Sequence, residues 1–390
     1  MSDSAWLSSS LHHHFGLIDD PRVQGRCAHR LVDIIVIALL AVLAGATGWE
    51  EIATYGQGKQ TWLSTFLELP NGIPSHDTFR RVLAQLDPDE LEARFQDWMG
   101  SLLDQIGGTL IAIDGKTVKG SYDRQNQIKA LQMVSAWSTA HRLVLAQTPV
   151  SGKSNEITAI PVLLEQLHVR GTIISIDAMG THRRIAQQIH AAGADYILAL
   201  KGNQGFLHKT AVAWFEDQER QQLETEVLQD HYLGVDSGHH RIETRQVWVF
   251  RAADVFPAAV CADWSGLQSL VVVRSRRQLW NQTTCETRFF LSSLSEKAVA
   301  FAQWIRAHWE IENCLHWCLD VVFGEDASRI RTQNAARNLS ILRRLALNLV
   351  RQHPGKGSLK MKRYRASLDN DFLMEILAYS LPHTLPHSLS

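Results

Sequence analysis

Two short apolar runs, each followed by an aspartate, stand out in the pattern of hydrophobic and polar positions. The run Leu110–Ile113 leads into Asp114, and the run Ile173–Ile176 leads into Asp177. Continuous apolar runs of this length are typical of strands that are buried on both faces of a sheet. A carboxylate at the end of such a strand is a poor core residue but a good ligand for a divalent cation. The pattern therefore predicts two strands of one sheet that bring both aspartates to one metal site.

The segments around these runs predict the rest of the sheet. Their order is strand, strand, strand, helix, strand, helix, strand, at residues 110–113, 131–137, 143–150, 157–167, 173–176, 183–191 and 196–200. The polar residues 138–141 predict a hairpin turn between the second and third strands. This order is typical of a ribonuclease-H-like sheet, in which the first and fourth strands are neighbours. We therefore predict an α/β fold, a ribonuclease-H-like mixed sheet flanked by helices, with Asp114 beside Asp177.

Helical patterns precede the sheet and predict an N-terminal helical domain at residues 1–104. Residues 1–20 are expected to be a loose lead-in, and a helix is expected from about His29. Ser75 predicts the N-cap of a later helix, and Pro88 predicts the first turn of the next one. Two helices joined this tightly are consistent with a helix-turn-helix that reads DNA ends, or with a plain helical bundle. The sequence leaves both interpretations open.

The remainder of the chain is predicted to form a catalytic domain at residues 105–350 and a tail. Segments rich in β-branched and aromatic residues predict a strand-rich insertion at about 202–297, before a last, mostly helical part. Residues 351–390 are predicted to be a basic C-terminal tail. The basic residues that suggest it are Arg343, Arg344, Arg351, Lys356, Lys360, Lys362, Arg363 and Arg365.

A third carboxylate is predicted within residues 307–331, which are dense in polar and aromatic groups. Glu310 and Glu312 lie two residues apart, so they point in different directions from a helix. Glu310 is expected to pair with Arg306, whereas Glu312 shares a face with His316. We therefore favour Glu312 as the metal ligand. Zinc is a weak alternative, because the spacing of the nearby His and Cys residues matches no common finger pattern.

Composition gives no sign of a general affinity for nucleic acid. The chain has 390 residues, a formal net charge of −1 and a pI of about 7.0, so any DNA-binding surface must be local. Five scattered cysteines favour a reducing compartment. No secretory signal is visible, and the most hydrophobic run, at residues 34–46, is too short to span a bilayer. We expect a soluble cytoplasmic protein without a membrane partner.

The motifs together resemble DDE-type insertion-sequence transposases of the H-repeat-associated group. They are IAIDGKTVKGSYD, KSNEITAIPVLL, TIISIDAMG, DYILALKGNQG and HWEIENCLHWCLDVVFGEDASRIR, followed by NLSILRRLALNL, while GWEEIATYG and GIPSHDTFRRVL resemble the accompanying N-terminal domain. The resemblance runs over nearly the whole chain. It implies that Asp114, Asp177 and Glu312 are the acidic triad that binds metal and catalyses the reaction.

The residues around Glu312 depart from the pattern of the wider superfamily. Many relatives carry an Arg four residues before the catalytic Glu and a Lys seven residues after it, where this chain has His308 and Leu319. We expect phosphate contacts from other basic residues near the site. The candidates for DNA contact are Lys116, Lys119, Lys201, Arg241, Arg245, His308, Arg329 and Arg331. For Arg241 and Arg245, an exposed strand of alternating charge is an equally good interpretation.

The resemblance also implies a two-metal mechanism with two Mg²⁺ (or Mn²⁺) ions in each active site. Relatives cut DNA at the ends of their element and join the free 3′ ends to a target. We therefore expect double-stranded DNA as partner, a homodimer or higher assembly on DNA, and association with the nucleoid. A nuclease of the same fold that only hydrolyses DNA and a DNA-binding relic are the alternatives.

Overall fold

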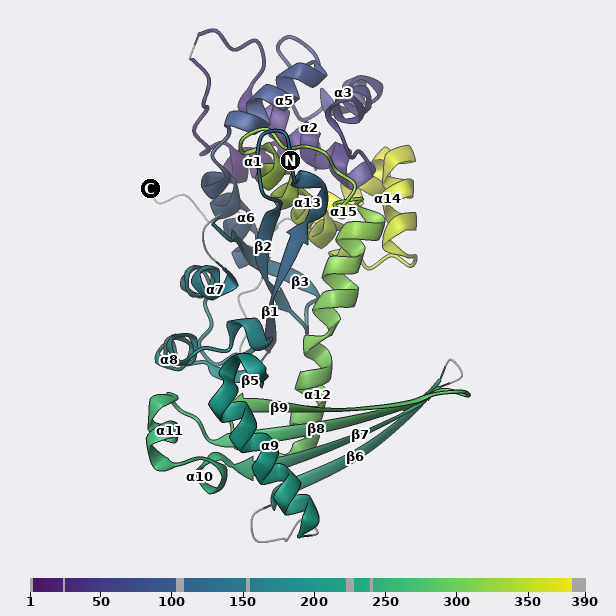
Figure 1. Ribbon diagram of the computed structural model, residues 1–390. Helices are drawn as coiled ribbons and strands as arrows, with labels where there is room; N and C mark the ends of the chain where they lie inside the picture. The colour runs from purple at the N-terminus through teal and green to yellow at the C-terminus, as the bar shows by residue number, and fades with distance from the viewer. Residues whose placement is uncertain are drawn as a thin grey trace.

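A single nine-stranded mixed sheet forms the centre of the computed structural model (Figure 1). The structure describes residues 3–23, 25–102, 109–151, 155–221, 228–238 and 241–380. The strand order is β3-β2-β1-β4-β5-β9-β8-β7-β6. The predicted α/β class and the sheet flanked by helices are therefore confirmed, although the predicted boundary at residue 104 and the end of the predicted tail lie outside the described residues.

The first five strands have the predicted ribonuclease-H-like arrangement. They are β1 (Leu110–Val118), β2 (Leu131–Ser138), β3 (Leu143–Pro149), β4 (Ile173–Ile176) and β5 (Asp195–Leu200). Strand β1 pairs antiparallel with β2 and parallel with β4, and β4 pairs parallel with β5. Helices α7 (Glu156–Glu165) and α8 (Arg183–Ala191) connect the parallel strands and cover one face with apolar side chains. This pairing makes β1 and β4 neighbours, as the sequence predicted.

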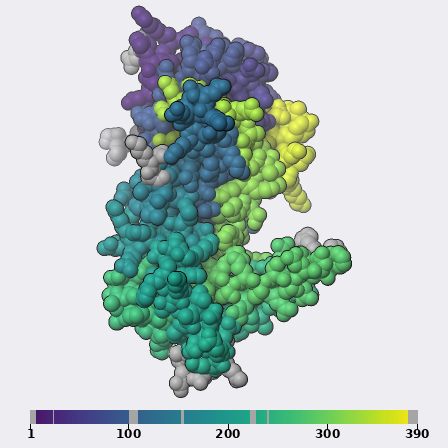
Figure 2. All heavy atoms as spheres, in the orientation of Figure 1, coloured from purple at the N-terminus to yellow at the C-terminus, as the bar shows by residue number. Residues whose placement is uncertain are grey.

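The strand-rich insertion continues the same sheet. Its strands are β6 (Leu228–Gly238), β7 (Arg241–Arg251), β8 (Ser269–Gln278) and β9 (Thr283–Ser292), and β9 pairs antiparallel with β5. Helix α9 (Gly205–Arg220) packs on the face shared with α7 and α8, and the short helices α10 (Ala252–Val255) and α11 (Ala258–Asp263) lie at one end. The far ends of the four strands project from the body as a curved arm (Figures 1 and 2).

Helix α12 (Ala298–His308) covers the opposite face of the sheet. Its residues Phe301 and Ile305 pack against apolar residues of β1, β4 and β5 and of the insertion strands. The chain then continues through two π-helical segments, Ile311–His316 and Cys318–Val322. Since α12 spans both halves of the sheet, it fixes where the following segment meets β1.

Helices from both ends of the chain share one core. The N-terminal helices are α1 (Asp3–Phe15), α2 (Leu31–Ala44), α3 (Trp49–Gly58), α4 (Gln60–Leu63), α5 (His76–Gln85) and α6 (Pro88–Leu102). The C-terminal helices are α13 (Ala335–Gln352), α14 (Leu359–Leu368) and α15 (Asn370–Ser380). Apolar residues of both groups form one continuous cluster, and Figure 1 shows the two groups side by side.

Two expectations about the chain ends need correction. The expected loose lead-in contains α1, whose residues Leu7, Leu11 and Phe15 are buried in this core. The expected basic tail contains α14 and α15, and Lys362 and Arg363 are buried there. The Arg363 guanidinium donates hydrogen bonds to backbone carbonyls of α2, so a basic residue near the end of the chain serves helix packing.

The apolar run that the sequence predicted as a buried helix is α2. All of its residues except Ala44 are buried. Among the described residues no single helix is long and apolar enough to cross a membrane, and only α2 and α3 together meet that test, as a pair bent by 97°.

Glu92 of α6 provides a stability prediction that depends on pH. Burial raises the pKa of its carboxyl to about 7, although the Gln147 backbone N–H donates a hydrogen bond to it over 3.1 Å. Since this pKa is above its ordinary value, ionised Glu92 lowers the free energy of unfolding as pH rises from about 4.5 past 7. We expect Glu92→Gln to stabilise the protein by about 3 kcal/mol at pH 8 and to have little effect below pH ~4.

Urea unfolding at the two pH values measures this difference. Glu165→Gln, on the exposed surface of α7, is the control and changes neither value. An equal effect of Glu92→Gln at both pH values would show that its ionisation does not limit stability.

Candidate active site

The sheet register places two aspartates side by side. Ile113 of β1 and Ile176 of β4 are parallel partners, and Asp114 and Asp177 each follow one of them. Strand β4 ends at this point, whereas β1 continues to Val118 and still pairs with β2. The expectation that Asp114 ends its strand is therefore wrong, but the parallel pairing ends there. The two carboxylates consequently lie at the same edge of the parallel part of the sheet.

Asp114 lies in an environment that disfavours its charge. Burial raises the pKa of its carboxyl to about 6, although His316 and the backbone N–H of Gly115 partly oppose this. The Gly115 N–H donates a hydrogen bond to Asp114 Oδ1 over 2.9 Å. A cation at this position would remove most of the cost of the charge.

The π-helical segment after α12 brings Glu312 to Asp114. His316 Nδ1 lies 3.3 Å from Glu312 Oε2 and 3.6 Å from Asp114 Oδ2. Ligand atoms of these three side chains all lie within 4.8 Å of one another. The hydrogen bond with His316 also lowers the pKa of Glu312. The two carboxylates are oxygen donors of the kind that Mg²⁺ and Mn²⁺ prefer, and His316 lies between them.

Glu310 lies away from Asp114, and the expectation that it pairs with Arg306 is wrong. Arg306 forms an ion pair with Asp236 of β6, and Glu310 Oε2 lies 3.7 Å from Arg142 Nε in the β2–β3 turn. The structure thus brings Glu312, and not Glu310, to Asp114.

Asp177 is held by a lysine. Lys201 Nζ lies 3.1 Å from Asp177 Oδ1. Burial raises the pKa of Asp177, but the Ala178 backbone N–H and Lys201 outweigh burial, and the net pKa is lowered. Asp177 and Lys201 also line a small cavity with His208 and Arg288. Asp177 therefore stays ionised at neutral pH. In the strand order β2-β1-β4, Asp177 follows β4, the strand that lies on the far side of β1 from β2.

Sequence reasoning missed two side chains at this site. In the sequence analysis, His316 is named only as a residue on the same helix face as Glu312. Its spacing of four residues from Glu312 is the signal that could have placed His316 at the site. Glu156, the first residue of α7, appears in the sequence analysis only as part of the motif KSNEITAIPVLL, with no role at the site. Its carboxylate lies directly over Gly115, because a Cβ built on that glycine would be 2.1 Å from Glu156 Oε1.

Comparison with known proteins identifies the family. A family model described as "Transposase DDE domain" matches residues 106–349, which is more than half of the chain. The chain belongs to the DDE transposase family. A second family model, described as "DDE_Tnp_1-associated", matches residues 12–99. The catalytic core and the N-terminal helices of this DDE transposase are thus both recognised.

Several relatives of this DDE transposase cover almost the whole chain. "Putative transposase YncI" of Escherichia coli O157:H7 is 40% identical over 373 residues, 95% of this chain and 94% of the relative. "H repeat-associated putative transposase YhhI" of Escherichia coli strain K12 is 38% identical over 375 residues, 95% of this chain and 98% of the relative. A protein of Xanthobacter autotrophicus named "Uncharacterized protein in dhlA 3'region" is 46% identical over 286 residues, 72% of this chain and 92% of the relative. The resemblance to the H-repeat-associated group is therefore confirmed.

Lys116 of this DDE transposase is not placed to contact DNA. It is 6% exposed, and its Nζ lies 2.6 Å from Asp320, 3.1 Å from Asp326 and 3.6 Å from Glu325. Glu325 is itself fully buried and paired with Arg344 of α13. These ion pairs tie the segment that follows Glu312 to β1, two residues from Asp114. The structure therefore contradicts the expected phosphate contact and gives Lys116 a positioning role.

His308 is likewise buried rather than available to DNA. It is 8% exposed, and its Nδ1 lies 2.9 Å from Ser175 Oγ of β4. Burial lowers the pKa of His308 to about 4, so the ring is neutral at neutral pH. It packs the end of α12 against the sheet, and the expected DNA contact is wrong in this structure.

The other DNA-contact candidates lie at or near the surface. Lys119 and Arg245 form ion pairs with Asp326 and Glu243, and Arg331 Nε donates to the Gly120 carbonyl. Lys201 pairs with Asp177, as described above. Arg241 at the start of β7 and Arg329 near the π-helical segments are exposed. His239 and His240, which precede Arg241, lie outside the described residues.

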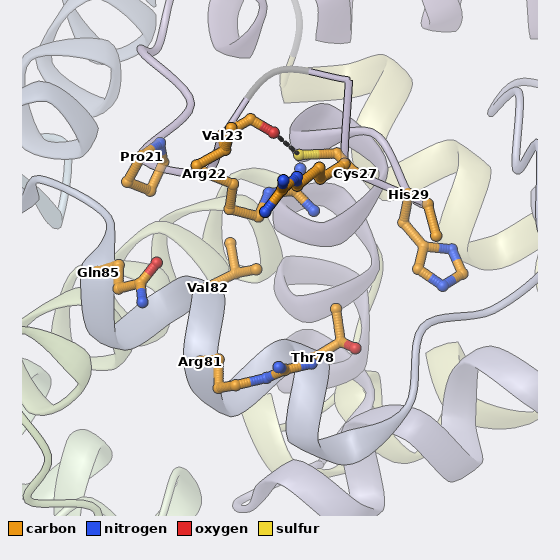
Figure 3. A pocket seen from close by; sticks show the side chains of 11 residues that line it. Pro21, Arg22, Val23, Cys27, His29, Thr78, Arg81, Val82 and Gln85 are labelled. Carbon is orange, nitrogen blue, oxygen red and sulfur yellow. Dashed lines mark hydrogen bonds between the residues drawn. The ribbon is translucent and has the colours of Figure 1, made fainter.

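A basic pocket in the N-terminal helices offers a second charged surface (Figure 3). It has a volume of about 480 Å³ and lies between residues 21–23 and 26–29 on one side and α5 on the other. Three arginines line it. The Arg22 guanidinium donates two hydrogen bonds to Asp20, and Arg81 Nε donates one to the Asp77 carbonyl. Arg26 forms no ion pair with the described residues. The described residues that line the pocket include three arginines and no acidic residue, so the pocket is positively charged.

Proposed function

We propose that this protein is a DNA transposase that binds the ends of its insertion sequence, cleaves the phosphodiester bonds there and joins the 3′ ends to target DNA. The observation that carries the proposal is the meeting of Asp114, Glu312 and His316, with Asp177 following the neighbouring strand. Three segments far apart in the sequence supply these acids. Family membership supports a role in transposition, and the acids supply the chemistry.

The carboxylates are proposed to hold two divalent cations, Mg²⁺ or Mn²⁺. Asp114 would contact both, while Asp177 and Glu312 would each contact one. Bound metal lowers the pKa of an attacking water or 3′-hydroxyl and neutralises charge on the leaving 3′ oxygen. His316 keeps Glu312 and Asp114 close to each other, and Lys201 orients Asp177. Catalysis then rests on positioning and electrostatics, with no covalent protein intermediate needed.

DNA is proposed to approach this edge of the sheet through basic groups at or near the surface. Lys201 pairs with Asp177, while Lys119, Arg329 and Arg331 follow the strand and the segment that carry Asp114 and Glu312. Arg241 and Arg245 belong to β7 of the projecting arm. Such groups contact phosphates and position the duplex without reading its sequence. We propose a homodimer or higher assembly on DNA, because two element ends have to be handled together, and a cytoplasmic location at the nucleoid.

The basic pocket is proposed to hold a phosphate of the element end. We expect the double substitution Arg26→Gln and Arg81→Gln to weaken binding of a duplex that carries the element end, and to reduce the slope of log K against log salt by about 2. Fluorescence anisotropy at several salt concentrations measures both. Arg80→Gln is the matched control on α5, because Arg80 already pairs with Asp77. An unchanged slope in the double variant would remove the pocket from the DNA interface.

A plasmid that carries the element's own ends tests the function itself. With Mg²⁺, we expect the protein to cut at the ends and to form products in which 3′ ends are joined to target DNA. Cutting without joined products would favour the hydrolysis-only nuclease. Specific binding without cutting, in Mg²⁺ and in Mn²⁺, would favour the DNA-binding relic.

A further inference from the structure

Glu156 lies against the residue that follows Asp114. A Cβ on Gly115 would be 2.1 Å from Glu156 Oε1 and 2.5 Å from its Cδ, so only a glycine leaves room for this carboxylate. Gly115 is in β1, and Glu156 begins α7, which packs on β2 and β3. The site thus contains a close approach between a helix start and the strand that carries Asp114.

The same face of α7 reaches the turn that follows Asp177. Glu156 and Ile160 are four residues apart and lie on one face of the helix. Ile160 Cδ1 would be 2.5 Å from a Cβ on Gly180, at the end of the turn Ala178–Gly180. Helix α7 therefore lies against both the residue that follows Asp114 and the turn that follows Asp177, and Glu156 is an acidic residue on that face of the helix.

Glu156 has no cationic partner among the described residues. Its one hydrogen bond there comes from Gln132 Nε2 of β2, over 2.7 Å to Oε1. The residue is half-buried, and Asp177 is close enough for its charge to act on Glu156. A partly buried carboxylate beside other carboxylates is costly unless a cation joins them. Two divalent cations would balance the charge of Asp114, Asp177, Glu312 and Glu156.

We propose that Glu156 is a fourth carboxylate of the metal site and helps to hold the divalent cation between Asp114 and Asp177. Glu156 does not belong to the group of three residues whose ligand atoms lie within 4.8 Å of one another. We therefore assign it to the cation position between Asp114 and Asp177, away from Glu312 and His316. This inference rests on the proposed function for the use of the metal. It concerns metal binding by this chain, which can be measured without DNA.

Mn²⁺ binding to the purified full-length protein tests the proposal, followed by electron paramagnetic resonance and by the thermal shift that Mn²⁺ causes. We expect Glu156→Gln to weaken one of the two Mn²⁺ positions by about tenfold or more. The matched control is Glu165→Gln, at the exposed end of the same helix, which binds Mn²⁺ as the wild type does. Without metal, Glu156→Gln unfolds at the wild-type temperature or above it, because the substitution removes an uncompensated charge.

Gly115→Ala is a second, steric variant. Its Cβ displaces the Glu156 carboxylate while all four acids remain, so we expect it to weaken the same Mn²⁺ position. Wild-type Mn²⁺ binding in Glu156→Gln would overturn the proposal, and so would a wild type that binds no Mn²⁺. If the wild type binds Mn²⁺ and loses one position in Glu156→Gln but never cleaves element ends, the fourth carboxylate stands and the transposase proposal fails.

Discussion

Asp114→Asn reduces Mg²⁺-dependent cleavage of element ends by about 10³-fold or more, and Asp177→Asn and Glu312→Gln do the same. Each substitution keeps the shape of the side chain and removes the charge that holds a divalent cation. Asp114 has the largest expected effect, because it is the acid shared by both proposed cation positions. Initial rates of strand cleavage on a plasmid with the element ends measure these losses.

Glu310→Gln is the matched control for these substitutions. Glu310 lies on the same segment as Glu312, but its carboxylate faces Arg142 instead of Asp114. We expect Glu310→Gln to cleave at the wild-type rate. A loss of cleavage in Glu310→Gln with retention in Glu312→Gln would show that the wrong glutamate has been assigned. Thermal unfolding of each variant without metal separates lost chemistry from lost folding.

Arg344→Met lowers the free energy of unfolding by about 3–5 kcal/mol, the largest stability effect that we expect. Arg344 Nη1 lies 2.8 Å from Glu325 Oε1, and both side chains are fully buried. Ser340 donates a further hydrogen bond to the same carboxylate oxygen. Loss of Arg344 therefore leaves the buried negative charge of Glu325 with much less compensating positive charge. Urea unfolding at neutral pH measures the loss.

Two further variants show whether the cost comes from the unpaired charge. In Glu325→Gln/Arg344→Met both charges are removed, and we expect it to recover part of the stability. Arg365→Met breaks an exposed pair with Asp369 and should cost less than about 1 kcal/mol. If Arg344→Met costs no more than Arg365→Met, the buried pair does not stabilise the fold.

The sequence predicted those parts of the fold that depend on local pattern. Ser75 caps α5 through a hydrogen bond from the Thr78 N–H, and Pro88 begins α6, as expected. The apolar runs before Asp114 and Asp177 form paired parallel strands. Their pairing could be predicted because the order of the elements is compatible with few topologies. The relation between the two aspartates could therefore be predicted before any contact was known.

The sequence failed where partners are remote in the chain. The burial of Lys116 depends on Asp320, Glu325 and Asp326, which lie about two hundred residues further on and which no local pattern links to β1. Arg363 looked like part of a basic tail for the same reason, since its acceptors are carbonyls of α2. Long-range ion pairs and hydrogen bonds override the expectation that a basic residue faces solvent.

Part of the candidate site could be predicted from the sequence. Glu312 was chosen on the assumption of a straight α-helix, whereas the segment is π-helical, and the choice fits the structure because the contact with His316 four residues on is retained. Glu156 escaped notice because its role depends on the close approach of α7 to Gly115, which requires the packed sheet. Tertiary packing, and not residue type, decides which acids meet.

Anomalous scattering from Mn²⁺ in crystals of this protein tests the central claim most directly. The account predicts two peaks at the edge of the sheet: one contacted by Asp114 and Glu312, the other by Asp114 and Asp177 with Glu156. Peaks at other side chains, or none at these carboxylates in Mn²⁺-soaked crystals, would contradict the assignment of this edge as the active site.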